Sequence, residues 1–339
     1  MSRAVAVPRA ESFTAARRLV DGARKIVLTT HVQPDGDGLG SEVAFARWLR
    51  SEGKDVTILN PNPTPRRLAF FHEIFPAEGF QADRAAELLA GADLLVVLDI
   101  SVPGRLGPLQ GPVGEHRPPT LIIDHHAGAA TIEGVDVRDE QAAATGEIVY
   151  RMLTAWGAEI EPPVATALYA AIAYDTGGFR YANTRVTTHE IAADLLRLGA
   201  DMALVHRHLF ESMTPARVRL LAHVLSSFEL SAGGRVASAI LPRATLKGFG
   251  AEPDDVDGAV EALRSIEGVV MAVVVREVRD GATKVSFRSR GDADVNAFAR
   301  GFGGGGHKNA SGAYFEEPLV QVAARVIPAA YKTFDPAES

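Results

Sequence analysis

The stretch Lys25–Ser41, KIVLTTHVQPDGDGLGS, decides the fold. It opens with Lys25–Thr30, an apolar run rich in β-branched residues, which predicts a buried strand. The run stops at His31, and a glycine-rich loop with two aspartates leads to the helix expected at Ser41–Ser51. A strand followed by a polar turn and a helix is one step of an α/β pattern.

The same alternation continues along the chain. Short apolar runs at Asp55–Leu59, Leu94–Leu98 and Leu121–Ile123 predict further strands, and Ala82–Leu89 predicts a helix. Alternating strands and helices predict a parallel sheet with helices on both faces. Ligands bind such sheets just past the carboxyl ends of the strands, so residues that directly follow these runs are candidates for a site.

The later part of the chain predicts a second, smaller domain. After helical stretches at Ala144–Trp156, Pro163–Tyr174 and Thr188–Leu198, the segment 199–227 is polar and helical. Short strands around one helix then predict an α/β domain with a mixed sheet: Phe228–Leu230, Arg235–Leu241, helix Pro253–Ile266, Val269–Arg276 and Thr283–Arg288. We expect one domain at 1–198, a helical linker at 199–227 and a second domain at 228–339.

Composition limits the classes of function. The 339 residues include no cysteine, which excludes thiolate sites and leaves histidine and carboxylate as metal ligands. The formal net charge of −7 argues against a protein that coats long nucleic acid through many basic contacts. The charge is unevenly spread, and Arg276–Lys308 has a local basic excess, with seven basic and four acidic residues, which suits phosphates or a solvated surface equally well. Neither a membrane span nor a signal sequence is apparent, so we expect a cytoplasmic protein with no membrane partner.

Four segments place hard metal ligands where an apolar run ends. They are His31 with Asp35 and Asp37, then Asp99 after LLVVL, then Asp124-His125-His126 after TLII, and Asp175 at the end of LYAAIAYD. Each piece alone is more often a turn, a helix cap or a hydrogen-bonded histidine. Together they predict one site for two divalent cations about 3.5–4 Å apart with a bridging carboxylate. Imidazole and carboxylate without sulfur favour Mn²⁺ or a similar ion.

The loop after His31 has two further expected features. Gly36, Gly38 and Gly40 are interpreted as residues that let the loop fold tightly, so that the two aspartates reach different metals. Ser41 is interpreted as the N-cap of the next helix, whose amide groups would then face an anion.

These motifs resemble those of a known family. HVQPDGDGLGS, VVLDIS, DHH and YDTGGFRYANT are similar to the four successive motifs of the DHH phosphoesterases, and GFGGGGHKNASG resembles the signature of their DHHA1 companion domain. Within the family, the length and short connector are most similar to the bifunctional oligoribonuclease and phosphoadenosine-phosphate phosphatase group, the NrnA type.

The resemblance implies a role for each ligand. His31 and Asp35 would bind one manganese ion, Asp37 the other, and Asp99 both. His125 and Asp175 would complete the second site, while His126 would act as a catalytic residue beside Asp99 by touching the scissile phosphate. Asp124 would orient its neighbours. Family habit also suggests a homodimer.

The second domain is expected to bind substrate. An arginine fork at Arg288 suits a phosphate, and Asn296 would add a polar contact. The bare backbone of Gly303–Gly306, in particular Gly304, Gly305 and Gly306, would approach an anion or a base next to His307. The alternative is a loose surface loop with solvated arginines.

The implied reaction is hydrolysis of short RNA oligonucleotides and of linear dinucleotides such as pApA and pGpG to mononucleotides. Removal of the 3′-phosphate of phosphoadenosine phosphate belongs to the same set, and cyclic dinucleotides remain open. The rival interpretations are a manganese inorganic pyrophosphatase, a nucleotide-sensing protein without catalysis, and a purely structural α/β module.

Overall fold

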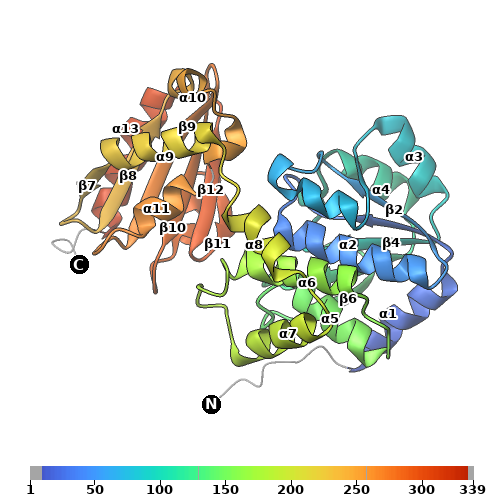
Figure 1. Cartoon of the computed structure of the whole chain (residues 1–339). Helices are drawn as coiled ribbons and strands as arrows, with labels where there is room; N and C mark the ends of the chain where they lie inside the picture. Colours follow the sequence, from blue (N-terminus) through green and yellow to red (C-terminus); the bar gives the residue numbers. More distant parts are fainter. Residues whose placement is uncertain (1–9, 129, 257, 335–339) are drawn as a thin grey trace, which may run out of the picture. The chain divides into compact units, whose positions relative to one another are not determined.

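The computed structural model describes residues 10–128, 130–256 and 258–334, which form two compact units, Met1–Ser212 and Met213–Ser339 (Figure 1). The division differs from the expected one because residues 199–227 do not form a separate linker. Helix α8 (Met202–Phe210) contributes Val205 to the core of the first unit, whereas α9 (Pro215–Ser227) contributes Leu220 to a core of the second. No helix in the described ranges is long and apolar enough to cross a membrane.

The first unit contains a fully parallel sheet of six strands. They are β1 (Lys25–Thr29), β2 (Asp55–Asn60), β3 (Ala77–Gly79), β4 (Leu94–Leu98), β5 (Thr120–Asp124) and β6 (Val135–Arg138), in the order β3-β2-β1-β4-β5-β6. The predicted parallel sheet is therefore confirmed, although the sequence analysis missed the short strands β3 and β6. The order reverses between β1 and β4, which is the point where ligands bind to sheets of this kind.

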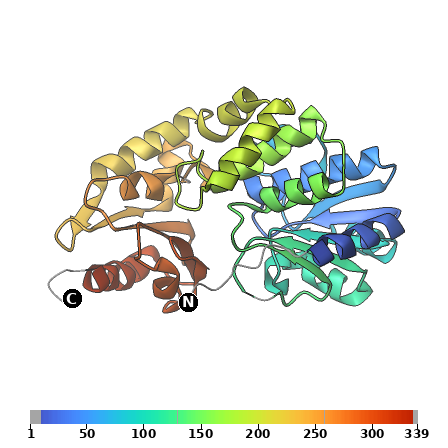
Figure 2. The same cartoon turned by 90° about the horizontal axis from the view of Figure 1, so that it is seen from below.

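Helices cover both faces of this sheet (Figure 2). The larger core packs α1 (Ala10–Gly22), α2 (Gly36–Ser51), η1 (Arg66–Glu73), α5 (Thr145–Ala155) and α6 (Pro162–Asp175) against the sheet, with α7 (Val186–Arg197) and α8 outside them. The smaller core holds α3 (Ala82–Ala90), η2 (Pro103–Leu109) and α4 (Gln110–His116) on the other face. Neighbouring residues of one strand alternate between the two cores, for example Ile26 and Val27.

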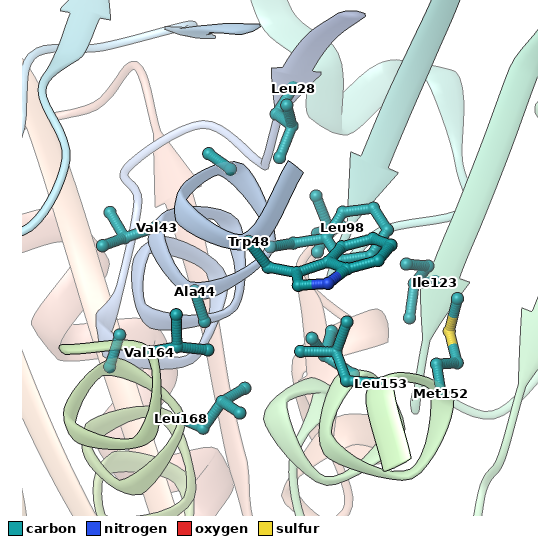
Figure 3. Packing of buried hydrophobic residues seen from close by; sticks show 14 of the residues in the cluster. Leu28, Val43, Ala44, Trp48, Leu98, Ile123, Met152, Leu153, Val164 and Leu168 are labelled. Carbon is teal, nitrogen blue, oxygen red and sulfur yellow. The ribbon is translucent and has the colours of Figure 1, made fainter. Parts of the chain in front are cut away.

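Helix α2 lies at the centre of the larger core. Figure 3 shows Trp48 reaching from α2 toward Leu98 of β4 and Leu153 of α5, while Ala44 lies beside α6. The approach of α2 to α6 requires a glycine, because a Cβ atom on Gly40 would lie 2.7 Å from the carbonyl oxygen of Ala167. The two helices are therefore packed backbone to backbone.

The start of α2 corrects two expectations. The helix begins at Gly36 rather than at Ser41, and its N-cap is Asp35, whose side chain accepts hydrogen bonds from the backbone N–H groups of residues 37 and 38. The three glycines, expected to let a loop fold tightly, lie instead in the first turns of α2, where they allow close packing. A Cβ atom on Gly36 would meet the ring of Tyr174 at 2.4 Å, and one on Gly38 would meet Thr30 Oγ1 at 2.4 Å.

The second unit has the expected mixed sheet. Its strands are β7 (Glu229–Ser231), β8 (Val236–Leu241), β9 (Met271–Arg279), β10 (Ala282–Ser289), β11 (Gly305–His307) and β12 (Ala310–Phe315), in the order β11-β12-β10-β9-β8-β7. Strands β8 and β9 are parallel, and the other neighbours are antiparallel. One face packs against α9, α10 (Arg243–Phe249) and α11 (Ala259–Arg264), the other against α12 (Val295–Arg300) and α13 (Leu319–Phe334).

Several elements of this unit differ from the expected ones. The helix expected at Pro253–Ile266 consists of two pieces, η3 (Pro253–Val256) and α11, with residue 257 outside the described ranges. Gly258 has a φ of 96° before α11, a conformation that interrupts a helix. Elements β11, β12, α10, α12 and α13 were not predicted.

We expect Gly40→Ala to destabilise the first unit by about 1–3 kcal/mol, because the added methyl group overpacks the α2–α6 contact. Gly22→Ala is the matched control, since a Cβ atom there meets nothing within 4 Å, and should change the free energy of unfolding by less than about 1 kcal/mol. Urea unfolding followed by circular dichroism measures both. Equal effects of the two substitutions would contradict the proposed backbone contact.

Candidate metal centre

Acidic and imidazole side chains gather at the carboxyl edge of the parallel sheet, where the strand order reverses. His31 follows β1, Asp99 follows β4, and residues 125 and 126 follow β5. Three groups have ligand atoms that all lie within 4.8 Å of one another: His31, Asp35 and Asp99; Asp37, His125 and Asp175; and Asp99, His125 and His126. The structure thus brings together every residue that the sequence analysis assigned to the metals or to catalysis.

The first group is built around a buried imidazole. Nδ1 of His31 lies 2.8 Å from the carbonyl oxygen of Val32 and donates to it, so Nε2 is the atom that presents a lone pair to a cation once the ring is deprotonated. Nε2 lies 3.5 Å from Oδ2 of Asp35 and 3.4 Å from Oδ2 of Asp99. It is buried and has no hydrogen bond within the described part of the chain.

These separations suit a shared cation. Ligands at about 2.0–2.2 Å from one ion are roughly 3.0–3.5 Å apart, which matches the spacing around Nε2 of His31. A buried polar atom without a hydrogen bond is costly unless it has another partner. Because the donor set consists of hard oxygen and nitrogen atoms, the first group fits a divalent cation.

The second group surrounds His125 in the same way. Its Nε2 lies 3.3 Å from Oδ2 of Asp175 and 3.8 Å from Oδ2 of Asp37. Nδ1 lies 3.3 Å from the carbonyl oxygen of Ala142, an outer contact of the kind that orients histidine ligands. The second group therefore fits a second cation.

Asp99 connects the two groups. Its Oδ2 faces His31, whereas its Oδ1 lies 3.5 Å from Nε2 of His125. The backbone of Asp99 has a φ of 64° and its N–H donates to the carbonyl oxygen of Ile123 at 2.9 Å. Aspartate tolerates this left-handed conformation better than most residues, and such conformations concentrate at functional sites. The carboxylate is only 2% exposed, so both oxygens are committed to the centre.

The first turn of α5 supports the ligands, a feature that the sequence analysis missed. The backbone N–H groups of Thr145 and Gly146 donate to the two oxygens of Asp37, at 2.6 and 3.0 Å. The hydroxyl of Thr145 also donates to Oδ1 of Asp99 at 3.0 Å. Ser41, expected as a helix cap, instead donates to Asp37 at 3.2 Å. A helix N-terminus favours a negative charge, so α5 stabilises the ionised ligand.

Negative charge accumulates in the centre. Burial and the charges of Asp99 and Asp175 raise the pKa of Asp37 well above its usual value. Burial and the charges of Asp35 and Asp99 do the same to the pKa of Asp175. Burial alone lowers the pKa of His31, but Asp35 and Asp99 together outweigh this effect and the pKa rises to about 10. In the metal-free protein, burial and like charges thus favour the protonated forms of Asp37 and Asp175.

Arg105 adds a positive charge that the sequence analysis also missed. It lies in η2, after Asp99, and its backbone carbonyl accepts a hydrogen bond from Val32 at 2.8 Å. Its charge lowers the pKa of both Asp35 and Asp175, among larger effects. The signal available in the sequence was its place in the DISVPGR segment that follows β4.

The expected substrate residues of the second unit lie on β10, on α12 and on or directly before the edge strand β11. Nε of Arg288 donates to Oε1 of Glu261 at 2.8 Å, so this guanidinium already has a carboxylate partner. Oδ1 of Asn296 accepts from the N–H of Gly306 at 3.1 Å and thus fixes the glycine run. His307 pairs through its backbone with Ala310, and its side chain lies outside the described part of the structure.

The glycine run is ordered by close strand contacts. A Cβ atom on Gly304 would lie 2.2 Å from the carbonyl oxygen of Gly312. One on Gly306, whose φ is 146°, would lie 2.5 Å from the carbonyl oxygen of Ala310. By contrast, a Cβ atom on Gly305 would meet only Oδ1 of Asn296, at 3.8 Å. Two of the three predicted glycines are therefore needed for the β11–β12 pairing itself.

Comparison with known proteins identifies two matching families. The description "DHH family, N-terminal domain" matches residues 25–172, and "DHHA1 domain" matches residues 233–335. The chain is 36% identical to the bifunctional oligoribonuclease and PAP phosphatase NrnA of Thermus thermophilus, over 85% of this chain and 83% of that protein. It is 28% identical to the Bacillus subtilis protein of the same name, over 85% of this chain and 88% of the relative.

Two solved structures share the fold. An exopolyphosphatase-related protein from Bacteroides fragilis is 26% identical with a TM-score of 0.91, covering 100% of this chain and 99% of the other. The exonuclease RecJ bound to manganese is 17% identical with a TM-score of 0.56, covering 100% of this chain and 98% of the other. The first similarity extends over the whole chain, and the second supports the fold alone.

We expect Mn²⁺ binding near neutral pH to release at least about one proton per protein. His31, with a pKa of about 10, is protonated at neutral pH before binding, and a cation binds the deprotonated imidazole. The raised pKa values of Asp37 and Asp175 act in the same direction. The apparent affinity should therefore fall as the pH falls. Titration calorimetry in two buffers of different ionisation enthalpy measures the release, and equal heats in the two buffers would contradict it.

Proposed function

The chain belongs to the DHH family of phosphoesterases, and we propose that it hydrolyses short oligoribonucleotides and linear dinucleotides on a pair of divalent cations. The substrate set includes pApA and pGpG, which would yield mononucleotides, and the 3′-phosphate of phosphoadenosine phosphate, which would yield AMP. The observation that supports this proposal most strongly is the position of Asp99, whose two carboxylate oxygens face two separate ligand groups. The names of the NrnA relatives support the substrate class.

The ligand assignment follows the two groups. His31, Asp35 and Asp99 would hold one cation, and Asp37, His125, Asp175 and Asp99 the other. When bound, such a pair supplies Lewis acidity at a phosphoryl group and lowers the pKa of water. Mn²⁺ suits this sulfur-free donor set of imidazole and carboxylate.

His126 would meet the substrate. Its Nδ1 donates to Oδ1 of Asp124 at 2.7 Å, so Nε2 is the ring atom that would reach a phosphoryl oxygen. Asp124 is completely buried. Burial alone raises its pKa, but the hydrogen bonds and charge of His126 outweigh this effect and hold the pKa well below its usual value. Asp124 therefore fixes the ring so that Nε2 would face the phosphoryl group, where a polar contact stabilises negative charge as the phosphorus–oxygen bond breaks.

The second unit would bind nucleotide on the face of β10, β12 and β11 that carries Arg288. The strand register aligns Arg288, Ala310 and His307 in one row across the sheet, and Ser286, Gly312 and Gly305 in the next. Small residues in these rows let a base or a phosphate approach the backbone. Arg288 would share its guanidinium between Glu261 and a phosphate, since an arginine has five N–H donors.

The charge of the protein supports short substrates. A net charge of −7 does not favour the many phosphate contacts on which binding of long nucleic acid depends. The chain is 27% identical to the cyclic-di-AMP phosphodiesterase GdpP of Geobacillus thermodenitrificans. The matched region spans 90% of this chain and 47% of that relative. Cyclic dinucleotides therefore belong in the substrate panel.

One assay separates this function from its rivals. With Mn²⁺ present, pApA, cyclic di-AMP, phosphoadenosine phosphate, a long RNA and inorganic pyrophosphate are compared. We expect turnover of pApA and phosphoadenosine phosphate, with little of the long RNA. Phosphate release from pyrophosphate alone would favour a manganese pyrophosphatase, and tight dinucleotide binding without turnover would favour a sensor.

We expect Asp99→Asn to reduce pApA hydrolysis at least about 1,000-fold, because the amide is a poor bridge between two cations. Asparagine also tolerates positive φ, so the backbone conformation is retained. Asp93→Asn is the control, since Asp93 accepts from the backbone N–H groups of Arg24 and Lys25 at the amino end of β1. Its kcat should stay within about twofold of wild type. Near-normal turnover by Asp99→Asn would remove the basis of the assignment.

A second pair of variants tests Arg288. Arg288→Ala should raise the KM for pApA about 10-fold or more, because a charge-assisted hydrogen bond to phosphate is lost, and leave Mn²⁺ affinity unchanged. Glu261→Gln removes the ion pair but keeps the guanidinium, so its KM should be equal to or below that of wild type. If both variants raise KM alike, Arg288 serves only the structure of the second unit.

A further inference from the structure

Arg138, the last residue of β6, makes hydrogen bonds to the DHH segment at the end of β5. Its side chain is only 12% exposed. Nε and Nη2 donate to the two oxygens of Asp136, at 3.1 and 3.3 Å. Nη1 points the other way and donates to two acceptors, Oδ2 of Asp124 at 3.1 Å and the carbonyl oxygen of His126 at 2.7 Å.

Three atoms of His126 make hydrogen bonds within this network. Its carbonyl oxygen accepts from Arg138, its backbone N–H donates to Oδ1 of Asp124 at 3.0 Å, and its Nδ1 donates to the same oxygen at 2.7 Å. Asp124 in turn is held on its other oxygen by Arg138. One guanidinium group thus fixes both the main chain and, through Asp124, the ring of His126.

We propose that Arg138 is a positioning residue, which holds His126 in the orientation that its reaction with the phosphoryl group requires. The proposal rests on the proposed function, in which His126 meets the substrate. The pair with Asp136 fixes the plane of the guanidinium, and that plane aims Nη1 at both acceptors. A lysine cannot reproduce this, because its ammonium group is a point charge without a planar fork.

The alternative is a salt bridge that serves only stability, and the chain contains a matched example. Arg151 of α5 is also largely buried and also joins two carboxylates, Asp139 and Glu147. Its described contacts include none of the proposed metal ligands and not His126. Arg151→Met therefore reports the effect of losing a buried arginine without disturbing His126.

The kinetic test measures kcat and KM for pApA in Arg138→Met, Arg138→Lys and Arg151→Met. Removing an outer partner of a site typically costs 10–100-fold, and we expect that loss in kcat for Arg138→Met, with KM within about threefold. Arg138→Lys keeps the charge and should lose about 5-fold or more, since it cannot hold both acceptors. Arg151→Met should lower the melting temperature and keep kcat within about twofold.

The same substitution made in a His126→Ala protein shows whether Arg138 acts through His126. When His126→Ala is already present, adding Arg138→Met should change kcat by less than about twofold, because coupled residues are not additive. The same fractional loss in both backgrounds would overturn the proposal, as would a wild-type kcat in Arg138→Met. If Arg138→Met does not fold, Arg138→Lys in the two backgrounds decides by the same criterion.

Histidine NMR of the metal-free protein tests the geometry without any activity. The Nδ1 proton of His126 should give a downfield signal that is absent in His126→Ala, present in wild type and Arg151→Met, and lost or shifted in Arg138→Lys. An unchanged signal in Arg138→Lys would overturn the positioning role. If wild type hydrolyses none of the proposed substrates, the proposed function fails, and this signal still decides how Arg138 acts on His126.

Discussion

The structure of the first unit depends on holding several carboxylates and imidazoles together at one buried place. Like charges in a poorly solvated site repel unless protons or cations balance them. Asp99 is the strictest case, because it is almost fully buried, adopts a left-handed backbone conformation and faces a different ligand group with each oxygen. The same repulsion raises the pKa values of Asp37 and Asp175 in the metal-free protein, because burial and the neighbouring carboxylates disfavour their charged forms.

The packing of the helices determines where these groups lie. Because α2 approaches α6 through Gly40, and Gly36 contacts Tyr174, the start of one helix and the end of the other meet. Asp37 in the first turn of α2 and Asp175 at the end of α6 therefore reach the same group. The N-terminus of α5 completes this arrangement by donating two backbone hydrogen bonds to Asp37. Core packing and ligand geometry thus depend on the same few contacts.

Much of this site could be predicted from the sequence, because parallel strands deliver the residues that follow them to one edge. His31, Asp99 and His125 follow from that rule alone. The role of Ser41 could not, since Asp35 competes for the same helix start and the choice depends on the packing of Gly36 against Tyr174. Thr145 and Arg138 lie far from their partners in the chain, so no local pattern indicates them. In the second unit, β11 was missed because glycine runs are typical of loops, whereas here the lack of side chains allows the run to pair closely with β12.

The central claim is that one carboxylate bridges two cations at the point where the strand order reverses. A crystal structure of the Mn²⁺-loaded protein, with anomalous scattering recorded at the manganese edge, tests it most directly. The account predicts two anomalous peaks about 3.5–4 Å apart, with one oxygen of Asp99 coordinating each ion or a single oxygen shared between them. A single ion, or two ions of which only one touches Asp99, would contradict it.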